Sequence, residues 1–554
     1  MIKRQQRIFS LLLLFSILMI ILMGRLAFIQ LVQGKELARE AVRQRAQKVV
    51  LNHNRGSILD RHGNSLLGGE ESKVLAVFPG LLARSESNIR EEVLAAIPQA
   101  NVKSYPFIAI DSLSPAEAEY FQDYQESGLI VARAYSRYGQ DALATHLTGH
   151  IGAADGEGKV GLEKYYNREL HGYPHTLAAV VDGKHRLVDG LGFRIWQDEQ
   201  QTAPSDLVLT IDKRIQQQVE AVMDRQIVQG AVVVLDPQNG EILAMASRPN
   251  YYQIELPRIL SNQTEYQSYL DAKPFINRGV LSYPPASIFK IVVAAAAFES
   301  GYSLLDRFNC PGYIQVGDRL FHCSQGRGHG DLDLVDAFAH SCNTVFIKLA
   351  LELGKDKLYD YARKMGLGEK IGLPLGSEDG AEELAGLLPS PVELPYMGDL
   401  ALMALGQGSL EATPLQVARL TAVVANGGYL VKPRLVLGLQ DKGGRLSPST
   451  LFPSSPTRVI SPLTANRLSF LMMNVVDQGT GKNAQSEQMI LGGKTGTAET
   501  GKTDAQGNPQ YYSWFSGLVP LVETRAVITI FMEEPQSNSA AVFKDIGEAI
   551  EPFL

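Results

Sequence analysis

The sequence predicts an α/β protein of the α+β kind, whose central sheet is antiparallel and flanked by helices. Strand-like segments rich in β-branched residues occur early in the C-terminal part of the chain, at 207–211, 231–235 and 241–246. Others occur late, at 492–497, 514–519 and 526–531. Helical stretches rich in Ala and Leu fill the interval. This order predicts one domain, 206–554, with a sheet built from both of its ends.

Length and composition limit the classes of function. The chain has 554 residues, of which 45% are hydrophobic, so it can form several domains with a large core. The net charge is −7 and no basic block interleaved with aromatic residues is present, so we expect no nucleic-acid partner. No GxGxxG motif follows a strand and there is no Walker loop, so we expect no nucleotide cofactor.

An apolar segment near the N-terminus predicts a single membrane-spanning helix at 8–29. Arg25 lies close enough to its end to reach the lipid headgroups. Three basic residues precede the segment, which favours a cytoplasmic tail at 1–7 and an extracytoplasmic location for the rest. A cleaved signal peptide is the alternative, but the apolar stretch is long and no A-x-A site follows it.

In the region 30–205 the sequence predicts a separate module with short helices, short strands and many turn residues. Three charged residues in it are interpreted as a salt-bridged structural core: Arg55, Asp60 and Arg61. His146 and His150 have the i, i+4 spacing of metal-ligand pairs, but no third ligand is evident, and we interpret them as core or solvated histidines.

The stretch from Tyr283 to Phe298 carries the first chemical motif. Two prolines precede an Ala-rich apolar run, so Ser287 falls in the first turn of a buried helix and Lys290 lies three residues on. Positions i and i+3 share one face of a helix, at the end where its dipole is positive. A hydroxyl beside an amine is the arrangement that a serine nucleophile needs, because the amine can accept its proton.

Two further motifs follow. Ser341 and Asn343 lie between apolar segments, where a hydroxyl and an amide could meet the central helix from the side. The segment Lys494 to Thr497 lies in a predicted strand that could pair with an extended peptide, and Gly496 would let a ligand approach closely. Each motif occurs by chance in other proteins, but the three in this order are a strong signal for penicillin-interacting serine enzymes.

With these motifs the chain resembles the class B penicillin-binding proteins, monofunctional D,D-transpeptidases of bacterial cell-wall synthesis. The resemblance covers nearly the whole chain and extends to Arg55-Gly56, Asn277-Arg278 and Gly406-Gln407-Gly408. It implies that the region 30–205 is a non-catalytic pedestal of the dimerisation type. The residue before Ser287 is often Gly in the family and is Ala286 here, and the residue after it is often Thr and is Ile288 here. We expect these two differences to alter packing or drug sensitivity. No glycosyltransferase motif precedes the domain, which disfavours the bifunctional class A proteins.

The resemblance implies roles for the first two motifs. Ser287 attacks the carbonyl between the two D-alanines of a peptidoglycan stem peptide and forms an acyl-enzyme. Lys290 is its base, with a pKa lowered by burial and by the nearby Lys494. Ser341 passes the proton to the leaving D-alanine, and Asn343 orients Lys290 and the substrate amide.

The third motif is implied to hold the substrate. Lys494, Thr495 and Thr497 bind the terminal carboxylate beside Gly496, and the backbone N–H groups of Ser287 and Thr497 form the oxyanion hole. An amine of a neighbouring stem peptide then accepts the acyl group and completes the crosslink. The family uses no metal or cofactor for this reaction, and β-lactams trap the same serine.

The chain contains three cysteines, Cys310, Cys323 and Cys342. None belongs to a pair of C-x-x-C motifs, so we expect no zinc site. Outside the membrane a disulfide between Cys310 and Cys323 is allowed, and free thiols are equally compatible with the sequence. Cys342 lies inside the second motif and is interpreted as a small buried residue.

The resemblance also implies partners: stem peptides, β-lactams, a membrane glycosyltransferase of the SEDS family, and other elongation or division proteins. Elongation, division and sporulation are all compatible with the motifs. Two alternative functions are a membrane-anchored β-lactamase of the same fold and a non-catalytic β-lactam sensor or scaffold. A β-lactamase needs a deacylating carboxylate or a carboxylated lysine, which the sequence does not reveal.

Overall fold

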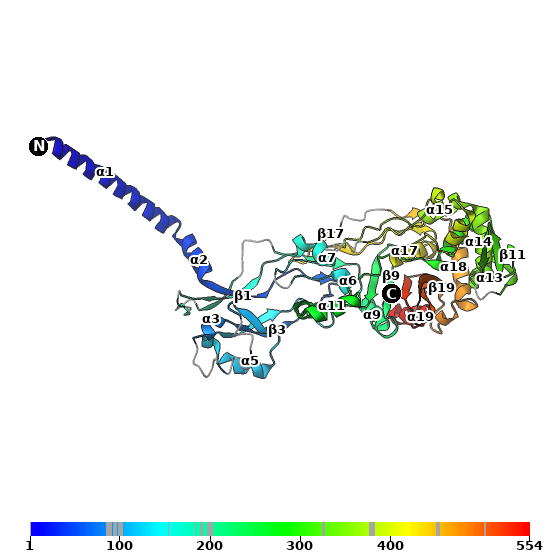
Figure 1. Ribbon diagram of the computed structural model, residues 1–554, viewed down its shortest axis with the longest axis horizontal. Coiled ribbons are helices and arrows are strands. Elements are labelled where there is room, and N and C mark those ends of the chain that lie inside the picture. Colours follow the sequence, from blue (N-terminus) through cyan, green and yellow to red (C-terminus); the bar gives the residue numbers. More distant parts are fainter. Residues whose placement is uncertain are drawn as a thin grey trace. The chain divides into compact units, whose positions relative to one another are not determined.

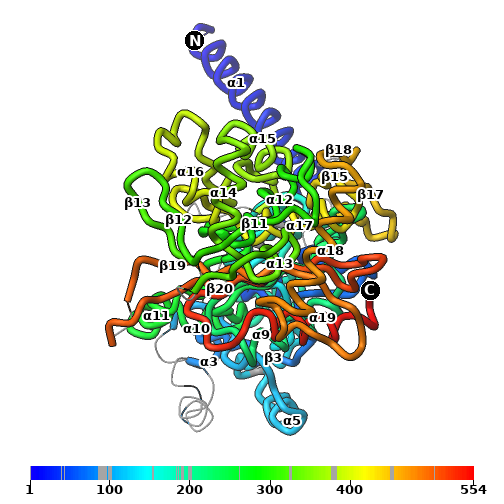
Figure 2. Tube along the Cα trace, turned by 90° about the vertical axis from the view of Figure 1, so that its right-hand side faces the viewer, coloured from blue at the N-terminus to red at the C-terminus, as the bar shows by residue number. Residues whose placement is uncertain are grey.

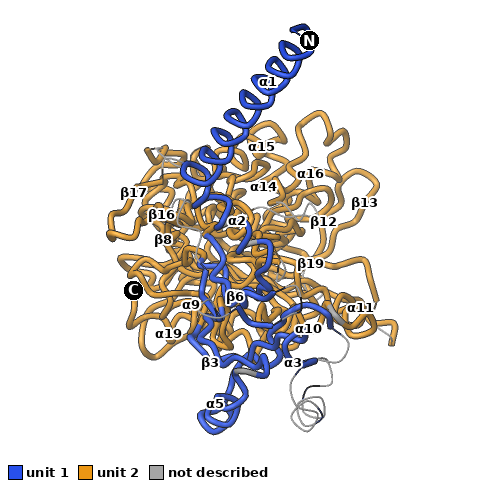
Figure 3. The backbone as a smooth tube through the Cα atoms, turned by 90° about the vertical axis from the view of Figure 1, so that its left-hand side faces the viewer, with its two compact units in different colours: residues 1–54, 70–136, 173–201 blue, residues 55–69, 137–172, 202–554 orange. Residues whose placement is uncertain are grey.

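The computed structural model describes residues 2–84, 91, 97, 103–152, 155–182, 184, 186–188, 192–196, 203–323, 327–375, 383–449, 455–503 and 506–554. The chain forms two compact units (Figure 3). Unit 1 comprises 1–54, 70–136 and 173–201, and unit 2 comprises 55–69, 137–172 and 202–554. Two segments of the predicted N-terminal module thus pack with the C-terminal part, and the domain boundary at 205 stays a prediction.

The N-terminal apolar segment forms α1 (Ile2–Ala27; Figure 1), which continues as a π-helical turn, η1 (Phe28–Val32). The helix has no buried residue, and its mean hydropathy reaches 2.6. Among the described residues it is the one helix long and apolar enough to cross a membrane. Because so much unpacked apolar surface is unfavourable in water, this helix is typical of a membrane anchor.

Unit 1 contains two three-stranded antiparallel sheets and the helices α2 (Gly34–Arg45), α3 (Pro79–Leu82) and α5 (Pro115–Gln122). One sheet has the order β1-β6-β7: Ala46–Asn52, His175–Val180 and Phe193–Trp196. The other has the order β4-β3-β5: Phe107–Ile110, Glu71–Val77 and Leu129–Tyr135. Val49, Val74, Ile130 and Leu177 share one core, so side chains from both sheets meet in it.

Unit 2 is organised around a five-stranded sheet in the order β10-β9-β21-β20-β19, with every neighbouring pair antiparallel. In that order the strands are Ile242–Arg248, Gln229–Leu235, Ala526–Glu533, Pro509–Val519 and Gly492–Thr503. Strands from both ends of the predicted domain thus lie side by side. The predicted α/β fold with an antiparallel sheet is confirmed.

Helices cover both faces of this sheet. Figure 2 shows β19 and β20 running between α9 and α19 on one side and α12, α14 and α17 on the other. Their bounds are Lys213–Gln226, Ser539–Ile550, Lys290–Glu299, Asn343–Leu353 and Pro414–Ala425. Successive residues of a strand face opposite sides of the sheet. Val232 and Val234 therefore lie in the core shared with α9 and α19, whereas Val233 and Leu235 lie in the core shared with α12, α14 and α17.

The predicted strand at 207–211 belongs to a different sheet. β8 (Asp206–Leu209) pairs with β2 (Ile58–Leu59) and β16 (Val436–Gln440), and β17 (Leu446–Pro448) completes a four-stranded sheet. The expectation that it would join the central sheet was wrong, because its partners come from distant segments that carry no pairing signal. Thr210 then links the two sheets by donating to the carbonyl of Ile242 at 2.8 Å.

Unit 2 contains further helices and strands. The helices are α6 (Thr145–Thr148), α7 (Gly161–Tyr165), α8 (Asn167–Leu170), α10 (Leu256–Ser261), α11 (Gln263–Asp271), α13 (Leu334–Ala339), α15 (Lys355–Lys364), α16 (Met397–Ala404) and α18 (Pro462–Asp477). The strands are β11 (Arg307–Cys310), β12 (Tyr313–Val316), β13 (Arg319–His322), β14 (Gly330–Asp333), β15 (Tyr429–Leu430) and β18 (Thr457–Arg458).

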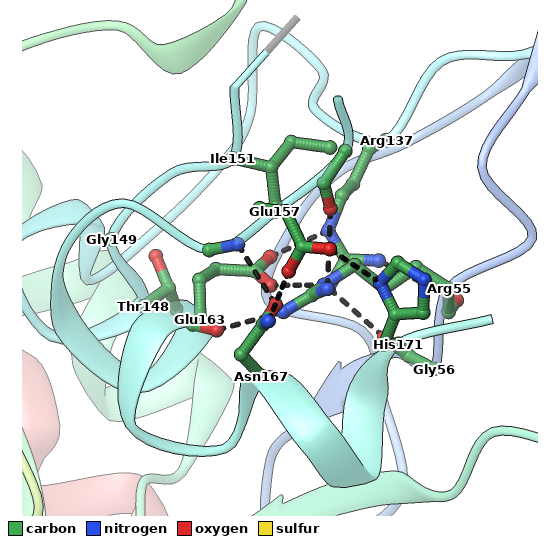
Figure 4. A network of polar contacts seen from close by, with 12 residues as sticks. Arg55, Gly56, Arg137, Thr148, Gly149, Ile151, Glu157, Glu163, Asn167 and His171 are labelled. Atoms are coloured by element: carbon green, nitrogen blue, oxygen red, sulfur yellow. Dashed lines mark hydrogen bonds and ion pairs between the residues drawn. The ribbon is translucent and has the colours of Figure 1, made fainter. Parts of the chain in front are cut away.

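A buried ionic network ties three segments of unit 2 together (Figure 4). Glu163, on α7, receives Arg55 Nε at 2.6 Å on one oxygen and Arg137 Nε at 2.5 Å on the other. Asp60 instead accepts backbone N–H groups, including that of Lys213 at 3.1 Å, and Arg61 pairs with Glu241 at 2.7 Å. The three charged residues predicted to form one salt-bridged core therefore serve three separate structural contacts.

Candidate active site

Ser287 lies in a 3₁₀ turn, η5 (Ala286–Phe289), that leads directly into α12. Ala286 has a φ of +52° and donates its N–H to the carbonyl of Gly406 at 2.9 Å. On the other side of the turn, Trp514 Nε1 donates to the carbonyl of Pro284 at 3.0 Å. Contacts from two distant elements thus hold the turn in place, with the Ser287 side chain half-buried.

Lys290 connects the first motif to the second. Its buried Nζ donates to the carbonyl of Ser341 at 2.7 Å, to Ser341 Oγ at 3.1 Å and to Asn343 Oδ1 at 2.8 Å. These contacts occupy all three donors of an ammonium group. The Lys290 backbone N–H donates to the Ser287 carbonyl, but among the described residues no hydrogen bond joins Lys290 Nζ to Ser287 Oγ. The two residues share one helix start, as predicted, without the direct side-chain contact that we expected.

Lys494 connects the third motif to the same hydroxyl. Its Nζ lies 3.1 Å from Ser341 Oγ and 3.1 Å from the carbonyl of Thr495, and its side chain is fully buried. The Ser341 hydroxyl is therefore shared between two amines. Two ammonium groups can only donate to it, so its own proton gains an acceptor when one amine is neutral.

β19, which carries the third motif, is an edge strand that packs on the nucleophile turn. A Cβ atom at Gly496 would lie 3.0 Å from the carbonyl oxygen of Pro285 and 3.2 Å from Ile288. The glycine thus permits close packing of the protein on itself, whereas the sequence had suggested room for a ligand. The Thr497 side chain is exposed, and that of Thr495 is half-buried.

Burial sets the electrostatics of the two lysines. Burial lowers the pKa of Lys290 to about 8. The Cys342 and Cys323 thiols raise this pKa, but their effect is smaller than that of burial. Burial, followed by the positive charge of Lys290, places the pKa of Lys494 well below its usual value. We expected both burial and the charge of Lys494 to lower the pKa of Lys290. Burial does so, as predicted, whereas the charge effect between the two lysines lowers the pKa of Lys494.

Thr480 is a site residue that the sequence analysis missed. It follows α18 and places its Oγ1 2.6 Å from Thr495 Oγ1, so it orients a hydroxyl of the third motif. Nothing in the sequence near it, Gly479-Thr480-Gly481, distinguishes it from an ordinary turn. Only the fold brings it to the edge strand.

The two histidines considered as metal ligands have structural contacts. His146 Nε2 bonds the carbonyl of Pro274 at 2.7 Å, and burial lowers the pKa of this imidazole to about 3. The rings of His146 and His150 both pack against Tyr251. They belong to an aromatic cluster, in agreement with the interpretation as core histidines.

All three cysteines are free and buried, so the disulfide that the sequence allowed between Cys310 and Cys323 is not formed. The cysteines gather with His329, a residue that no spacing pattern had connected to them. Their sulfurs lie next to the second motif, since Cys342 is the N-cap of α14.

The fold and the meeting of the three motifs define a serine acyltransferase of the penicillin-interacting kind. A family model described as "Penicillin binding protein transpeptidase domain" matches residues 230–548. The chain belongs to this family, as one of its class B penicillin-binding proteins.

Similar proteins cover most of the chain. Stage V sporulation protein D of Bacillus subtilis is 28% identical over 96% of this chain and 82% of its own length. The peptidoglycan D,D-transpeptidase MrdA of Acinetobacter baumannii is 27% identical over 97% and 85%. A solved structure described as "Structural coordination of polymerization and crosslinking by a peptidoglycan synthase complex" has a TM-score of 0.70 at 25% identity, and the match covers 98% of both chains.

Proposed function

We propose that this chain is a membrane-anchored peptidoglycan D,D-transpeptidase acting through a Ser287 acyl-enzyme. The observation that supports this most strongly is the sharing of the Ser341 hydroxyl by Lys290 and Lys494, 3.1 Å from each. It joins the three motifs in one place, beside the turn that carries Ser287. Family membership and a relative named as a D,D-transpeptidase agree with this function.

In the acylation step, Lys290 is the base. Its ammonium form uses every donor on neighbouring groups and has no lone pair, so it must first lose a proton. Burial favours that loss. The neutral amine then accepts the Ser287 proton while Oγ attacks the carbonyl between the two D-alanines. Asn343 Oδ1, 2.8 Å from Nζ, keeps the amine oriented.

Ser341 returns the proton to the departing D-alanine. Its oxygen accepts from both lysines, so its hydrogen can point at the leaving amine, and Lys290 can then replace the proton along a 3.1 Å hydrogen bond. The amine of a second stem peptide then attacks the Ser287 ester and receives the acyl group. Its proton passes along the same groups in the opposite direction. The Ser287 ester breaks, a new amide forms, and the enzyme is regenerated.

The substrate is held along the edge strand. The Thr495 and Thr497 hydroxyls bind the terminal carboxylate, and the buried Lys494 supplies positive charge behind them. The backbone N–H groups of Ser287 and Thr497 stabilise the oxyanion, each contributing about 3–4 kcal/mol in related chemistry. A β-lactam resembles the D-alanyl-D-alanine end and acylates the same serine.

We further place the N-terminus in the cytoplasm and the catalytic unit outside it. The three basic residues before the apolar part of α1 support this orientation. The proposed partner is a SEDS-family glycosyltransferase in the membrane, since a similar solved structure is described as a peptidoglycan synthase complex. Co-purification of the solubilised chain with such a polymerase tests the assignment, and an anchor-free chain should fail to recover it.

A fluorescent penicillin tests the nucleophile. The detergent-solubilised full-length chain should bind one label per molecule, and Ser287→Ala should abolish labelling. Ser300→Ala is the matched control, because Ser300 lies at the far end of the same helix and is exposed. Undiminished labelling of Ser287→Ala would refute the assignment.

The reaction itself separates the alternatives. With a pentapeptide substrate and an acceptor amine, mass spectrometry should find D-alanine release together with a crosslinked product. Rapid turnover of a chromogenic cephalosporin would indicate a β-lactamase instead. Growth rescue of a deletion strain by Ser287→Ala would indicate a non-catalytic sensor or scaffold.

A further inference from the structure

Tyr283 is the residue that precedes the two prolines of the nucleophile turn, and its main chain is fixed by one neighbour. Its N–H donates to the carbonyl of Ala412 at 3.0 Å, and its carbonyl accepts the Ala412 N–H at 2.9 Å. Pro284 and Pro285, which follow, have no N–H group to donate. Tyr283 is therefore the last residue before the turn whose N–H can hold this segment, and the acyl-transfer steps described above assign it no role.

The Tyr283 side chain is buried against β21. Its ring stacks on that of Phe531, with the ring centroids 3.9 Å apart and an angle of 30° between the planes. Its hydroxyl donates to Glu533 Oε1 at 3.0 Å. Phe531 and Glu533 are two residues apart on β21, so they face the same side of the sheet. A single strand thus holds both the ring and the hydroxyl.

Arg278 holds the Glu533 carboxylate in place. Its Nε donates at 3.0 Å to the same oxygen that accepts the Tyr283 hydroxyl, and its side chain is 2% exposed, against 22% for Glu533. The Arg278 N–H donates in turn to Ser247 Oγ on β10 at 3.1 Å. A buried guanidinium needs a paired carboxylate, and hydrogen bonds to an ionised acceptor are stronger than neutral ones. Glu533 is therefore a fixed, charged acceptor for Tyr283.

Glu533 also lies in register with the strand that carries the third motif. It pairs with Tyr512 of β20, and Tyr512 pairs with Ala498 of β19. Ala498 directly follows Thr497, whose N–H is assigned to the oxyanion hole. Because hydrogen-bonded neighbours in a sheet keep a fixed spacing, a contact to Glu533 sets a distance to this part of β19.

We propose that Glu533 positions the Ser287 turn relative to β19 through its hydrogen bond to Tyr283. Arg278 keeps the carboxylate in place for this contact. The nucleophile and the oxyanion N–H of Thr497 must both reach one carbonyl group, so a small displacement between them slows acylation. Tyr283, Glu533 and Arg278 are positioning residues, since they act through the turn, and the proposal rests on the proposed function.

A proton-carrying role is the first alternative for a tyrosine close to a nucleophile. Burial, followed by the charge of Glu533, raises the pKa of the Tyr283 phenol above its ordinary value, so the phenol keeps its proton. That proton is used in the hydrogen bond to Glu533. The second alternative is anchoring by the stacked ring alone, in which case the hydroxyl is dispensable. Removing the hydroxyl while keeping the ring therefore tests the proposal.

Stopped-flow labelling with the fluorescent penicillin at several concentrations separates reversible binding from the acylation step. In the full-length chain in detergent, Tyr283→Phe should slow the acylation step at least about tenfold and leave reversible binding unchanged. Tyr251→Phe is the matched control, because its buried hydroxyl donates to the Thr145 carbonyl at 2.8 Å. Each variant loses one buried hydrogen bond, so both should be destabilised in thermal unfolding, but only Tyr283→Phe should acylate slowly.

Variants of Glu533 test the acceptor. Glu533→Ala removes it and should slow acylation as much as Tyr283→Phe does, whereas Glu533→Gln keeps an acceptor oxygen and should retain most of the wild-type rate. The double variant Tyr283→Phe/Glu533→Ala should be no slower than Glu533→Ala, because both changes remove the same hydrogen bond. If Glu533→Ala does not fold, Tyr283→Phe and Glu533→Gln still decide between the outcomes.

An acylation step in Tyr283→Phe as fast as in the wild-type chain would overturn the proposal, and so would equal slowing in Tyr251→Phe. Additive effects in the double variant, or a rate in Glu533→Gln as low as that of Tyr283→Phe, would overturn it as well, because the hydrogen bond would then not be the cause. The proposed function fails separately: Ser287→Ala would then keep the label, whatever the effect of Tyr283→Phe.

Discussion

Ser341 is the residue at which the three motifs meet. Its oxygen lies 3.1 Å from both Lys290 Nζ and Lys494 Nζ, and its backbone takes a positive φ of +54° just before α14. Two buried cations around one hydroxyl repel each other, so the arrangement favours the loss of a proton. An amine that is neutral near physiological pH is what the proposed mechanism requires of its base.

The first prediction concerns pH. With a Lys290 pKa of about 8, the active neutral amine increases as pH rises. The acylation rate should therefore fall about tenfold per pH unit well below this pKa and level off above it. Stopped-flow measurement of penicillin labelling between about pH 6 and about pH 9 checks the profile.

Lys348→Ala is the control for this profile, because Lys348 is exposed and lies on α14 away from the motifs. Its profile should match that of the wild-type chain. A rate independent of pH across the range, or one that falls as pH rises, would contradict the role of Lys290 as the base.

At the scale of elements, the nucleophile turn depends on a glycine loop at Gly406. A Cβ at this position would come within 1.9 Å of the carbonyl oxygen of Ala286, which precedes Ser287. No L side chain fits there without movement of the backbone. The loop therefore shapes the start of α12 although it takes no part in bond making.

We predict that Gly406→Ala displaces the turn and slows penicillin acylation by about 10²-fold. Gly408→Ala is the matched control, since Gly408 has a similar φ of +73° but its nearest neighbour, Leu402 Cβ, would be 3.3 Å away. In both variants the alanine has to adopt a positive φ, which is strained. Only in Gly406→Ala does the new Cβ also collide with the carbonyl oxygen of Ala286. Similar labelling rates for the two would disprove the positional argument.

The network around Glu163 is an element-scale feature with a stability consequence. One fully buried carboxylate pairs with two guanidinium groups, those of Arg55 and Arg137. Glu163→Gln should lower the free energy of unfolding by about 3–5 kcal/mol, because it leaves buried charge uncompensated. Urea titration of the solubilised chain measures this.

Glu157→Gln serves as the comparison for that measurement. Glu157 belongs to the same region, but its side chain is 43% exposed, so its loss should cost less than about 1 kcal/mol. If Glu163→Gln unfolds at the same urea concentration as the comparison variant, the network does not stabilise the fold as proposed.

At the scale of the whole molecule, the anchor and the catalytic unit make separate contributions. The helix from Ile2 to Val32 has no buried residue, so nothing in the described chain depends on packing against it. Deleting residues 2–32 should transfer the protein from the membrane fraction to the soluble fraction, with unchanged penicillin labelling per molecule. Fractionation followed by labelling tests both outcomes, and persistent membrane association would point to a second contact with the bilayer.

Local patterns were sufficient for much of the fold and part of the site. The apolar N-terminal helix, the helix after Ser287, and strands 231–235, 241–246 and 526–531 were all predicted from residues close together in the chain. Their causes act over a few residues: hydropathy, prolines at a helix start, and runs of β-branched side chains. The nucleophile with its lysine belongs to this class, because a separation of three residues places both at one helix start.

Contacts between distant segments followed no such pattern. Lys290 meets Ser341 across 51 residues and Lys494 meets it across 153, while β8 pairs in a sheet that no local pattern indicated. His329 joins three cysteines in the same way. Such partners are selected by how helices and sheets pack around a shared core, and that packing depends on the whole chain at once. A short segment can therefore encode a helix, a strand or a reactive pair, but the hydroxyl shared by two amines and the cluster of four donor atoms exist only once the chain has folded.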